Sequence, residues 1–334
     1  MAEVLIARLG ELALAEESMK GTKVASSTLV DGTSSKFRVY DLTYTPDVQL
    51  FERGTAAATL SRYAHLVGQT LGKISGRIEQ RKTAAAGTAD AWQSILKAGG
   101  LKLASSIWSP SSVQSDHKTL TAYCFMGSTG AATVRIGLRG AMCSSLKFVG
   151  KVGAPGMWEF EILGISDGDD VDGTPSNTFA LKPTDDALNT ITHEGAVPTV
   201  FQGVAFTYGG ATKRLSTFEL DLGLGIAPRD DVSSDQGVLH YVITDRQPKV
   251  TIDPDFGLVA NTDDYLTHLH VGTEVALAWA YLVSTSRTFT FAAPKAQVIA
   301  LTPGNRNGIA TQGVTLALNR SAEPGDDEFT ITES

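Results

Sequence analysis

Apolar and polar residues alternate with a period of two along most of this chain. From Trp158 to Ile162 and from Thr217 to Leu222, large apolar side chains fall on one side and polar ones on the other. Such alternation is typical of antiparallel strands that cover a core with one face. Other apolar positions with this spacing are Leu120, Ala122, Cys124, Met126, Val134, Ile136, Leu138, Val204, Phe206, Tyr208, Phe289, Phe291, Val314, Leu316 and Leu318. The sequence therefore predicts a mainly β (α+β) fold.

The N-terminal segment is predicted to be helical. Within Val4–Glu17, Leu5, Leu9 and Leu12 recur at helical spacing. The segment lacks the basic start of a signal peptide, so we expect it to belong to the folded protein.

A second short helix is predicted near residues 89–98. Thr88–Ala91 supplies an N-cap signal, and Gly99 and Gly100 end the pattern. Its apolar stripe consists of Trp92, Ile95 and Leu96. We expect Trp92 to pack against a sheet rather than to stack on a ligand.

One order of features occurs twice in the chain. An extended stretch leads into a long excursion, which closes on a short His-containing segment and a further strand. In the first copy these elements are Thr43–Leu50, His65–Gly68 and Lys73–Glu79. In the second copy they are Arg246–Pro254, His268–Gly272 and Glu274–Leu282. The repetition predicts two tandem β-sandwich or barrel domains, each with a long protruding loop, and at least one short flanking helix.

The charge distribution places a boundary near the middle of the chain. Residues 1–165 hold 18 Lys and Arg and 13 Asp and Glu, whereas residues 166–334 hold 10 and 23, giving +5 and −13. Ser166–Asn177 is acidic and rich in turn residues. We therefore predict an N-terminal β domain at 1–165, an acidic linker at 166–192 and a C-terminal β domain at 193–334. The acidic second half argues against tight binding of nucleic acid, which needs clustered Lys and Arg.

Apolar runs and cysteine content argue against a membrane-spanning protein and a disulfide-bonded one. No apolar run approaches the ~20 residues of a membrane span. The chain has 2 cysteines, Cys124 and Cys143, both in apolar runs. We expect them to be buried, reduced thiols in a protein made inside a cell.

Motifs for catalysis, metals and cofactors are incomplete, so we expect no enzyme and no cofactor. A calcium loop starting at Asp167 would place Val171 where an oxygen ligand belongs. His268 and His270 would share one face of a strand, but no third His or Cys lies nearby in sequence. Gly68–Lys73 has the wrong spacing for a phosphate-binding loop, and Ser144–Lys147 lacks the partner motifs of its enzyme class.

The order of these segments resembles the major tail tube protein of long-tailed phages with flexible, non-contractile tails, from about Leu12 to Thr332. Leu12–Thr22 resembles that family's opening helix and its Glu-x-x-x-Gly-Thr turn, and Gly87–Leu101 resembles its helix. The segments similar to its strands and turns are Tyr44–Arg53, Thr119–Gly127, Gly137–Leu146, Glu159–Ile162, Phe218–Asp221, Arg246, Pro294–Val298 and Asp326–Ile331. Many members of the family have one tube domain, whereas this chain is expected to have two.

The resemblance implies a structural virion protein whose β-sandwich domains form rings that stack into a tail tube. Rings usually contain six tube domains, so a two-domain chain is expected to form trimers with pseudo-sixfold symmetry. The implied partners are other copies of the chain, the tape-measure protein in the lumen, the tail terminator, and distal tail or baseplate proteins. DNA would pass along an acidic lumen without specific binding. The implied location is the virion tail, after assembly in the host cytoplasm and without a membrane.

Stacking requires elements that leave the plane of a ring. We expect the excursions Glu52–Val67 and Asp255–Val271 to do this, because such long loops are uncommon and these carry apolar residues. The alternative is that each loop packs on its own domain. The predicted inter-ring contact residues are Glu52, Arg53, Leu60, Tyr63, Leu66, Asp255, Tyr265 and Leu269.

Two other functions remain open at this point. A tube protein of a contractile tail or of a type VI secretion apparatus would share the fold, although these usually have one domain. A carbohydrate-binding double β-sandwich would need exposed aromatic residues in a groove, and the aromatic content here is 7%.

Overall fold

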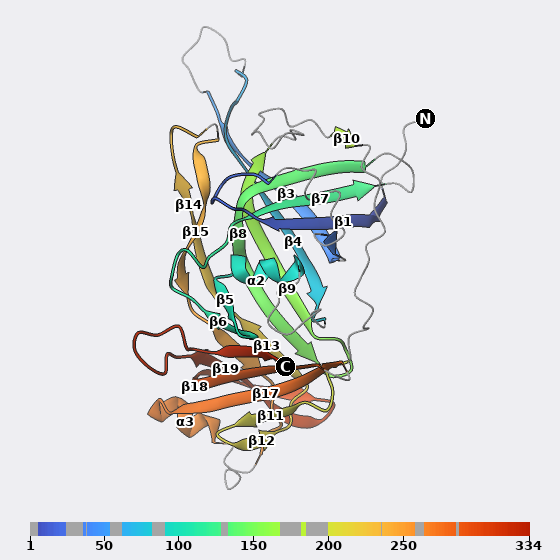
Figure 1. Cartoon of the computed structure of the whole chain (residues 1–334). Coiled ribbons are helices and arrows are strands. Elements are labelled where there is room, and N and C mark those ends of the chain that lie inside the picture. Colours follow the sequence, from blue (N-terminus) through green and yellow to red (C-terminus); the bar gives the residue numbers. More distant parts are fainter. Residues whose placement is uncertain are drawn as a thin grey trace.

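The computed structural model consists mainly of antiparallel strands, as predicted (Figure 1). It describes residues 6–24, 36–37, 39–53, 62–81, 91–127, 133–167, 182–184, 200–234, 236–257, 264–284 and 287–334. The first nine strands are β1 (Ile6–Glu16), β2 (Lys36–Phe37), β3 (Tyr40–Phe51), β4 (Leu66–Glu79), β5 (Leu101–Ala104), β6 (Ile107–Pro110), β7 (Leu120–Gly127), β8 (Thr133–Lys151) and β9 (Met157–Asp167). The others are β10 (Lys182–Thr184), β11 (Ala205–Tyr208), β12 (Ala211–Lys213), β13 (Thr217–Asp221), β14 (Leu224–Asp230), β15 (Val238–Arg246), β16 (Lys249–Ile252), β17 (Glu274–Ser284), β18 (Arg287–Arg306), β19 (Ile309–Leu318) and β20 (Thr330–Glu333). The helices are η1 (Ala91–Gln93), α2 (Ser94–Ala98) and α3 (Tyr265–Val271).

Most first-half strands form one antiparallel run in the order β2-β1-β7-β8-β9-β4-β3. α2 packs against β8, so closely that a Cβ at Gly99 would lie 2.5 Å from Leu146 Cδ2. Trp92 is buried in the core, as expected. The helix predicted near residues 89–98 is thus confirmed over 91–98, and its N-cap signal lies outside the described residues.

β8 joins the two halves of the chain. Its first part pairs with β7, whereas Lys147–Lys151 pairs with β13 of the second half. From β13 the sheet continues through β16 and β19 to β18. β18 passes from this sheet into a second one, ordered β12-β11-β17-β18-β20-β6-β5, so first-half strands also border the second half. The β14–β15 hairpin forms a separate two-stranded sheet beside β8 (Figure 1).

Buried apolar side chains of both halves belong to one cluster. Phe148 on β8 packs against aromatic side chains of both halves of the chain. Trp158 belongs to the first half, and Trp279 and Phe289 belong to the second. The ring centroid of Phe148 is 5.3 Å from that of Trp158, 5.5 Å from Trp279 and 5.4 Å from Phe289. The division into domains at 1–165 and 193–334 remains a prediction, because most of residues 166–192 lie outside the described part of the chain.

The helix predicted over Val4–Glu17 is wrong, because Ile6–Glu16 is the strand β1. Leu12 and Leu14 enter the main core, while Ala13 on the other face packs with Tyr123 and Phe125. Both faces of β1 are therefore covered here, and the sequence shows a continuous run of apolar and small residues in place of alternation.

His268 and His270 were expected to lie on one face of a strand, and this prediction is also wrong. These residues lie in α3, which Asp264 caps by accepting a hydrogen bond from the Thr267 N–H at 2.8 Å. Gly272 ends the helix with φ of 74°. The two excursions therefore differ: the first closes a hairpin between β3 and β4, and the second connects β16 and β17, which do not pair with each other. The strands predicted after each excursion are confirmed as β4 and β17.

The Glu-x-x-x-Gly-Thr turn has a clear structural basis. The buried Glu17 carboxylate accepts hydrogen bonds from the N–H groups of Gly21 and Gly140, both at 2.7 Å, and from the hydroxyls of Thr119 and Thr121. Burial raises the pKa of Glu17, although these hydrogen bonds oppose the change. Gly21 has φ of 80°, and a Cβ there would lie 2.2 Å from the carbonyl oxygen of Leu239. The turn thus holds β1, β8 and β15 together.

Glu17→Ala is expected to lower the free energy of unfolding by about 2 kcal/mol, because it leaves buried N–H donors without an acceptor. Urea unfolding measures the change. Glu16→Ala is the matched control, since the Glu16 side chain is 34% exposed and pairs with Lys97 at 2.6 Å. A loss no larger for Glu17→Ala than for this control would contradict the assigned role.

Candidate functional site

The β3–β4 hairpin extends beyond the rest of the molecule at the end far from β11 and β12 (Figure 1). We call its outer part, residues 48–53 and 62–68, the arm. The neighbouring parts of β4 from Thr70 onward are largely buried, whereas every residue of β3 from Thr45 to Phe51 is exposed. The arm is therefore a two-stranded ribbon with water on both faces.

The arm carries apolar side chains on both of these faces. Leu50 is directly opposite Val67, and Phe51 is directly opposite Leu66. Because successive residues of a strand point to opposite faces, the two pairs lie on different faces of the ribbon. The exposed fractions are 58% for Leu50, 64% for Val67, 49% for Phe51 and 55% for Leu66. Contiguous exposed apolar surface of this kind marks interaction sites.

Glycines in β4 order the hairpin. A Cβ placed at Gly68 would lie 2.7 Å from Phe51 Cε2, one at Gly72 would lie 3.0 Å from Tyr44 Cε2, and one at Gly76 would lie 2.3 Å from Val39 Cγ1. Side chains of the β3 segment thus lie across β4 where it has none of its own. An isolated two-stranded hairpin is marginally stable, so the contact of Phe51 at Gly68 supports the arm itself, and the contacts at Gly72 and Gly76 support the base of the hairpin.

Charged groups mark the end of the arm. Arg62 forms an ion pair with Glu52 at 2.8 Å, with side chains 80% and 71% exposed. The guanidinium of Arg53 lies 5.6 Å from the centroid of the Tyr63 ring. Both contacts join a residue that follows β3 to a residue that precedes β4. Exposed pairs of this type contribute little to the free energy of folding.

The structure brings together part of the predicted contact set. Glu52, Arg53, Tyr63 and Leu66 meet in the arm, while Leu60 lies outside the described residues. Sequence reasoning missed Val48, Leu50 and Phe51 because it placed them on the strand that enters the loop. Val67 was inside the predicted excursion Glu52–Val67 but was not singled out as a contact residue. Pro46, which a strand tolerates only at an edge, was a signal that could have exposed this strand as an outer one.

The described residues of the second excursion, 255–257 and 264–271, do not form a comparable projection. Tyr265 was expected at a surface and is instead 1% exposed, with its ring 5.1 Å from that of Tyr208. Leu269 packs against the core from the same face of α3, and Asp255 is paired with Arg306. For Tyr265 and Leu269 the alternative interpretation is the one observed, because one face of α3 directs these two side chains toward the core, whereas Leu266 and Val271 on the helix are 54% and 72% exposed.

The end of the molecule away from the arm has a cleft of about 290 Å³ between the residues before β11 and the segment from β12 to β13. Phe201, Val204, Phe206 and Leu215 give it an apolar lining. Val152 on its rim is 60% exposed, and Phe256 nearby in the chain after β16 is also 60% exposed. Exposed apolar groups therefore occur at both ends of the long axis.

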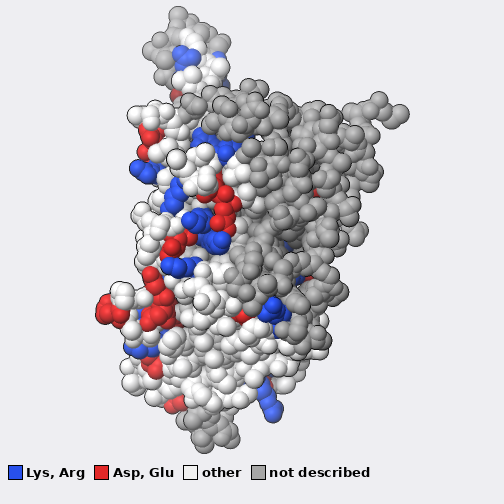
Figure 2. All heavy atoms as spheres, viewed as in Figure 1, with Lys and Arg blue, Asp and Glu red and all other residues white. Residues whose placement is uncertain are grey.

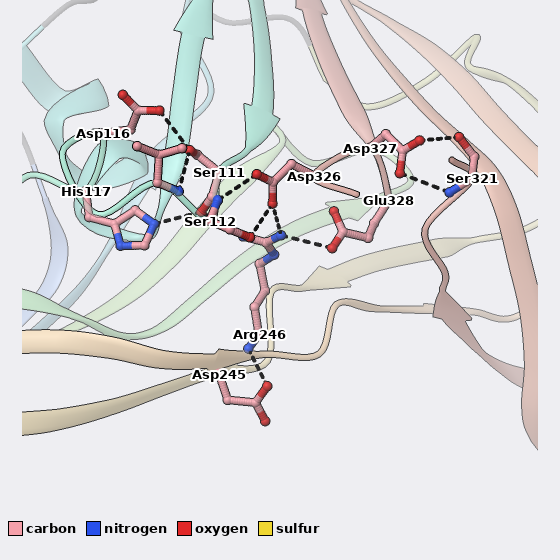
Figure 3. A network of polar contacts seen from close by, with 11 residues as sticks. Ser111, Ser112, Asp116, His117, Asp245, Arg246, Ser321, Asp326, Asp327 and Glu328 are labelled. Atoms are coloured by element: carbon pink, nitrogen blue, oxygen red, sulfur yellow. Dashed lines mark hydrogen bonds and ion pairs between the residues drawn. The ribbon is translucent and has the colours of Figure 1, made fainter. Parts of the chain in front are cut away.

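A polar network was a second candidate site (Figure 3). Arg246 donates to the carbonyl of Ser111 at 3.1 Å, to Asp326 at 3.1 Å and to Glu328 at 2.9 Å. Asp326 also accepts hydrogen bonds from the N–H and hydroxyl of Ser112. Arg246 is shared by two carboxylates, all three side chains are at least partly buried, and the network joins three segments distant in sequence, so we assign it a structural role.

Metal ligands and cysteines give no further candidate site among the described residues. These residues contain no group of three or more His, Cys, Asp or Glu placed to hold a metal ion. Cys124 and Cys143 are free and buried as expected, and burial raises the pKa of Cys124 to about 12.

None of the helices in the described part of the chain is long and apolar enough to cross a membrane. No protein-family model matches the chain, and no curated protein matches it with significant sequence similarity.

Proposed function

We propose that this chain is a structural subunit that assembles with copies of itself into a tube, as the tail tube proteins of non-contractile phage tails do. The observation that carries the proposal is the arm, which exposes apolar pairs on both faces of a projecting ribbon. A site for a small molecule would be concave, whereas the arm is convex. Its shape and composition suit insertion between other protein surfaces.

Open strand edges support lateral assembly into rings. β3, β5 and β12 each pair with one neighbour among the described strands. Unpaired edges tend to recruit another chain, and a head-to-tail ring covers them when its rotation closes. We propose rings of three chains with pseudo-sixfold symmetry, the number that follows if each chain contributes two tube domains.

Apolar surface at both ends supports stacking of the rings. The arm leaves one end of the molecule, and the cleft near β11 and β12 opens at the other. In a stack of rings that all point the same way, the arm of one ring faces the cleft end of the next. Burial of Leu50, Val67, Phe51 and Leu66 would contribute roughly 25 cal/mol for each Å² removed from water.

The remaining partners follow from the tube itself. The lumen would hold the tape-measure protein and later pass DNA, and the tube ends would meet the tail terminator and the distal tail proteins. The face shown in Figure 2 carries Lys and Arg next to Asp and Glu in a mixed stripe. We therefore place the acidic lumen surface on a different face, where the excess acid of residues 166–334 would repel DNA.

Replacing one apolar pair of the arm is expected to abolish tubes. In the Leu50→Ser/Val67→Ser variant both side chains are exposed, so the monomer should fold normally. Negative-stain electron microscopy and mass measurement should show tubes or threefold rings for the wild-type chain, and only rings or single chains for the variant.

The control variant Val113→Ser/Val232→Ser removes two exposed apolar side chains, 54% and 104% exposed, outside the arm. It should form tubes like the wild type. Long tubes from the arm variant would exclude the arm from stacking, and a wild-type chain that stays monomeric at every concentration would contradict spontaneous self-assembly.

A further inference from the structure

A cavity of about 680 Å³ lies between the turn that follows β1 and the β14–β15 hairpin. Its lining consists of Met19, Lys20, Gln114, Arg229, His240 and Val242. None of these residues belongs to the arm or to the polar network around Arg246. Three of the six are basic, and they come from the β1 turn, β14 and β15.

The register of the hairpin sets two of these basic groups side by side. Arg229 is directly opposite His240 in the β14–β15 ladder, so both side chains lie on the same face of the ribbon. Lys20 approaches from the other wall of the cavity. Burial, and then the charges of Lys20 and Arg229, lower the pKa of His240. A lowered pKa favours the neutral imidazole, so the fixed positive charges at this cavity are those of Lys20 and Arg229.

The described residues do not supply a compensating anion. Neither Lys20 nor Arg229 forms an ion pair among them, and Lys20 Nζ donates to the carbonyl of Gln114 at 2.6 Å. Asp231 feels the charge of Arg229, but its Oδ1 already accepts hydrogen bonds from the N–H and the hydroxyl of Ser233 at 2.8 and 2.6 Å. Glu17, in the same turn as Lys20, is occupied by its own donors.

His240 is the most deeply placed of the three basic residues in this lining. The side chain is 6% exposed, and its Nδ1 has no hydrogen-bond partner in the described part of the chain. Buried polar atoms normally have partners, and an exception calls for an explanation. The backbone here is firmly held, because a Cβ at Gly140 would lie 2.9 Å from the Cα of His240. The fold therefore holds the imidazole at the wall of the cavity, with its Nδ1 shielded from solvent.

We propose that this cavity binds an oxyanion group, a phosphate or a carboxylate, between Lys20, Arg229 and His240. Arg229 offers a planar set of donors that fits two oxygens, and Lys20 adds a compact charge. His240 takes up a proton when the anion enters, because a negative charge nearby favours the imidazolium. A bound anion would also connect the β14–β15 hairpin to the β1 turn, two elements that do not share a sheet ladder.

Proton uptake makes binding depend on pH. The charges that act on His240 are those of Lys20 and Arg229. The charged groups next to these residues or to the adjoining backbone are Lys118, Asp231, Arg139 and Glu17. Lys and Arg stay charged and Asp231 stays ionised between about pH 5.5 and 8. Burial raises the pKa of Glu17, so His240 and Glu17 are the groups whose charge can change near this window, and protonation of either makes the site more positive. Anion affinity should therefore rise as the pH falls through it.

Equilibrium dialysis with radiolabelled inorganic phosphate tests the proposal at constant ionic strength, with acetate as the parallel arm. The method applies equally to single chains and to assemblies, so its outcome is independent of the proposed tube function. The wild-type chain should bind one phosphate or acetate per chain with saturation. Tighter binding of phosphate assigns a phosphate group, and tighter binding of acetate assigns a carboxylate.

Lys20→Gln and Arg229→Gln should each weaken binding at least about tenfold, the loss expected for a charged hydrogen bond. Lys102→Gln and Arg320→Gln make the same charge changes at exposed positions elsewhere, with side chains 51% and 63% exposed, and should bind like the wild type. Arg229 is itself exposed, so its variant should fold even if a His240→Asn variant does not. The absence of saturable binding to both anions, or equal affinity of Arg229→Gln and Arg320→Gln, would overturn the proposal.

Discussion

Phe148→Ala is expected to lower the free energy of unfolding by about 4 kcal/mol, the loss typical of a buried aromatic residue in a packed core. Phe148 is 1% exposed, and it stacks on Trp279 with an interplanar angle of 19°. It also contacts Trp158 and Phe218, so its removal opens a cavity bordered by strands of both halves. The surrounding rings are large and rigid, and they cannot collapse into the space.

Urea unfolding followed by near-ultraviolet circular dichroism measures this effect and also tests how the halves cooperate. A single transition that shifts as a whole is expected, because β8 and β18 belong to the sheets of both halves. Phe256→Ala, at a position 60% exposed, is the control and should change stability little. Two transitions, of which only one moves, would show that residues 1–165 and 193–334 unfold as separate domains.

Arg246→Ala is expected to cost about 3 kcal/mol at neutral pH, because it leaves two carboxylates near each other without their cation. The Arg246 side chain is 11% exposed, and those of Asp326 and Glu328 are 30% and 16% exposed. Burial alone would raise the pKa of Asp326, but hydrogen bonds from Ser112 and Arg246 outweigh it and hold the pKa below the usual value of an aspartate. The stability that Asp326 contributes is therefore present at neutral pH and is lost as the pH falls below that value.

Thermal and urea unfolding between neutral and acidic pH measure the effect of Arg246→Ala. The difference from the wild type should be largest near neutrality and should shrink as Asp326 becomes protonated. Arg320→Ala provides the control, since Arg320 and Glu323 form an ion pair with side chains 63% and 74% exposed, and its cost should stay below about 1 kcal/mol. Equal losses for the two arginine variants would contradict the importance assigned to burial.

Strand alternation predicted a large part of the fold. Trp158, Phe160 and Ile162 are buried on β9, and Phe218 and Leu220 are buried on β13, as their spacing indicated. The pattern failed for β1, which is covered on both faces, and for α3, whose His-Leu-His segment has too few positions to separate the two periods. Local patterns record how many faces of an element are buried, and they do not record which neighbour buries them.

The candidate sites depended more on long-range geometry. Glu52, Arg53, Tyr63 and Leu66 were found from the sequence because they lie in an unusually long excursion. Leu50 and Val67 become a surface pair only through the β3–β4 register. Arg229 and His240 face each other across a ladder with two irregularities, one of them directly after Arg229. A shift of one residue would move one of these side chains to the opposite face, so the cavity could not be inferred from the sequence.

The shared strand β8 has a mechanical consequence for any assembly built from this chain. Its 19 residues span roughly 60 Å as an extended strand. A pull on the arm would pass from β4 to β9 and then to β8 through hydrogen bonds that lie across the direction of the load. Such bonds resist together in shear and do not open one after another. The subunit would therefore transmit tension from one end to the other with little extension. Bending of an assembly would be confined to the contacts between subunits.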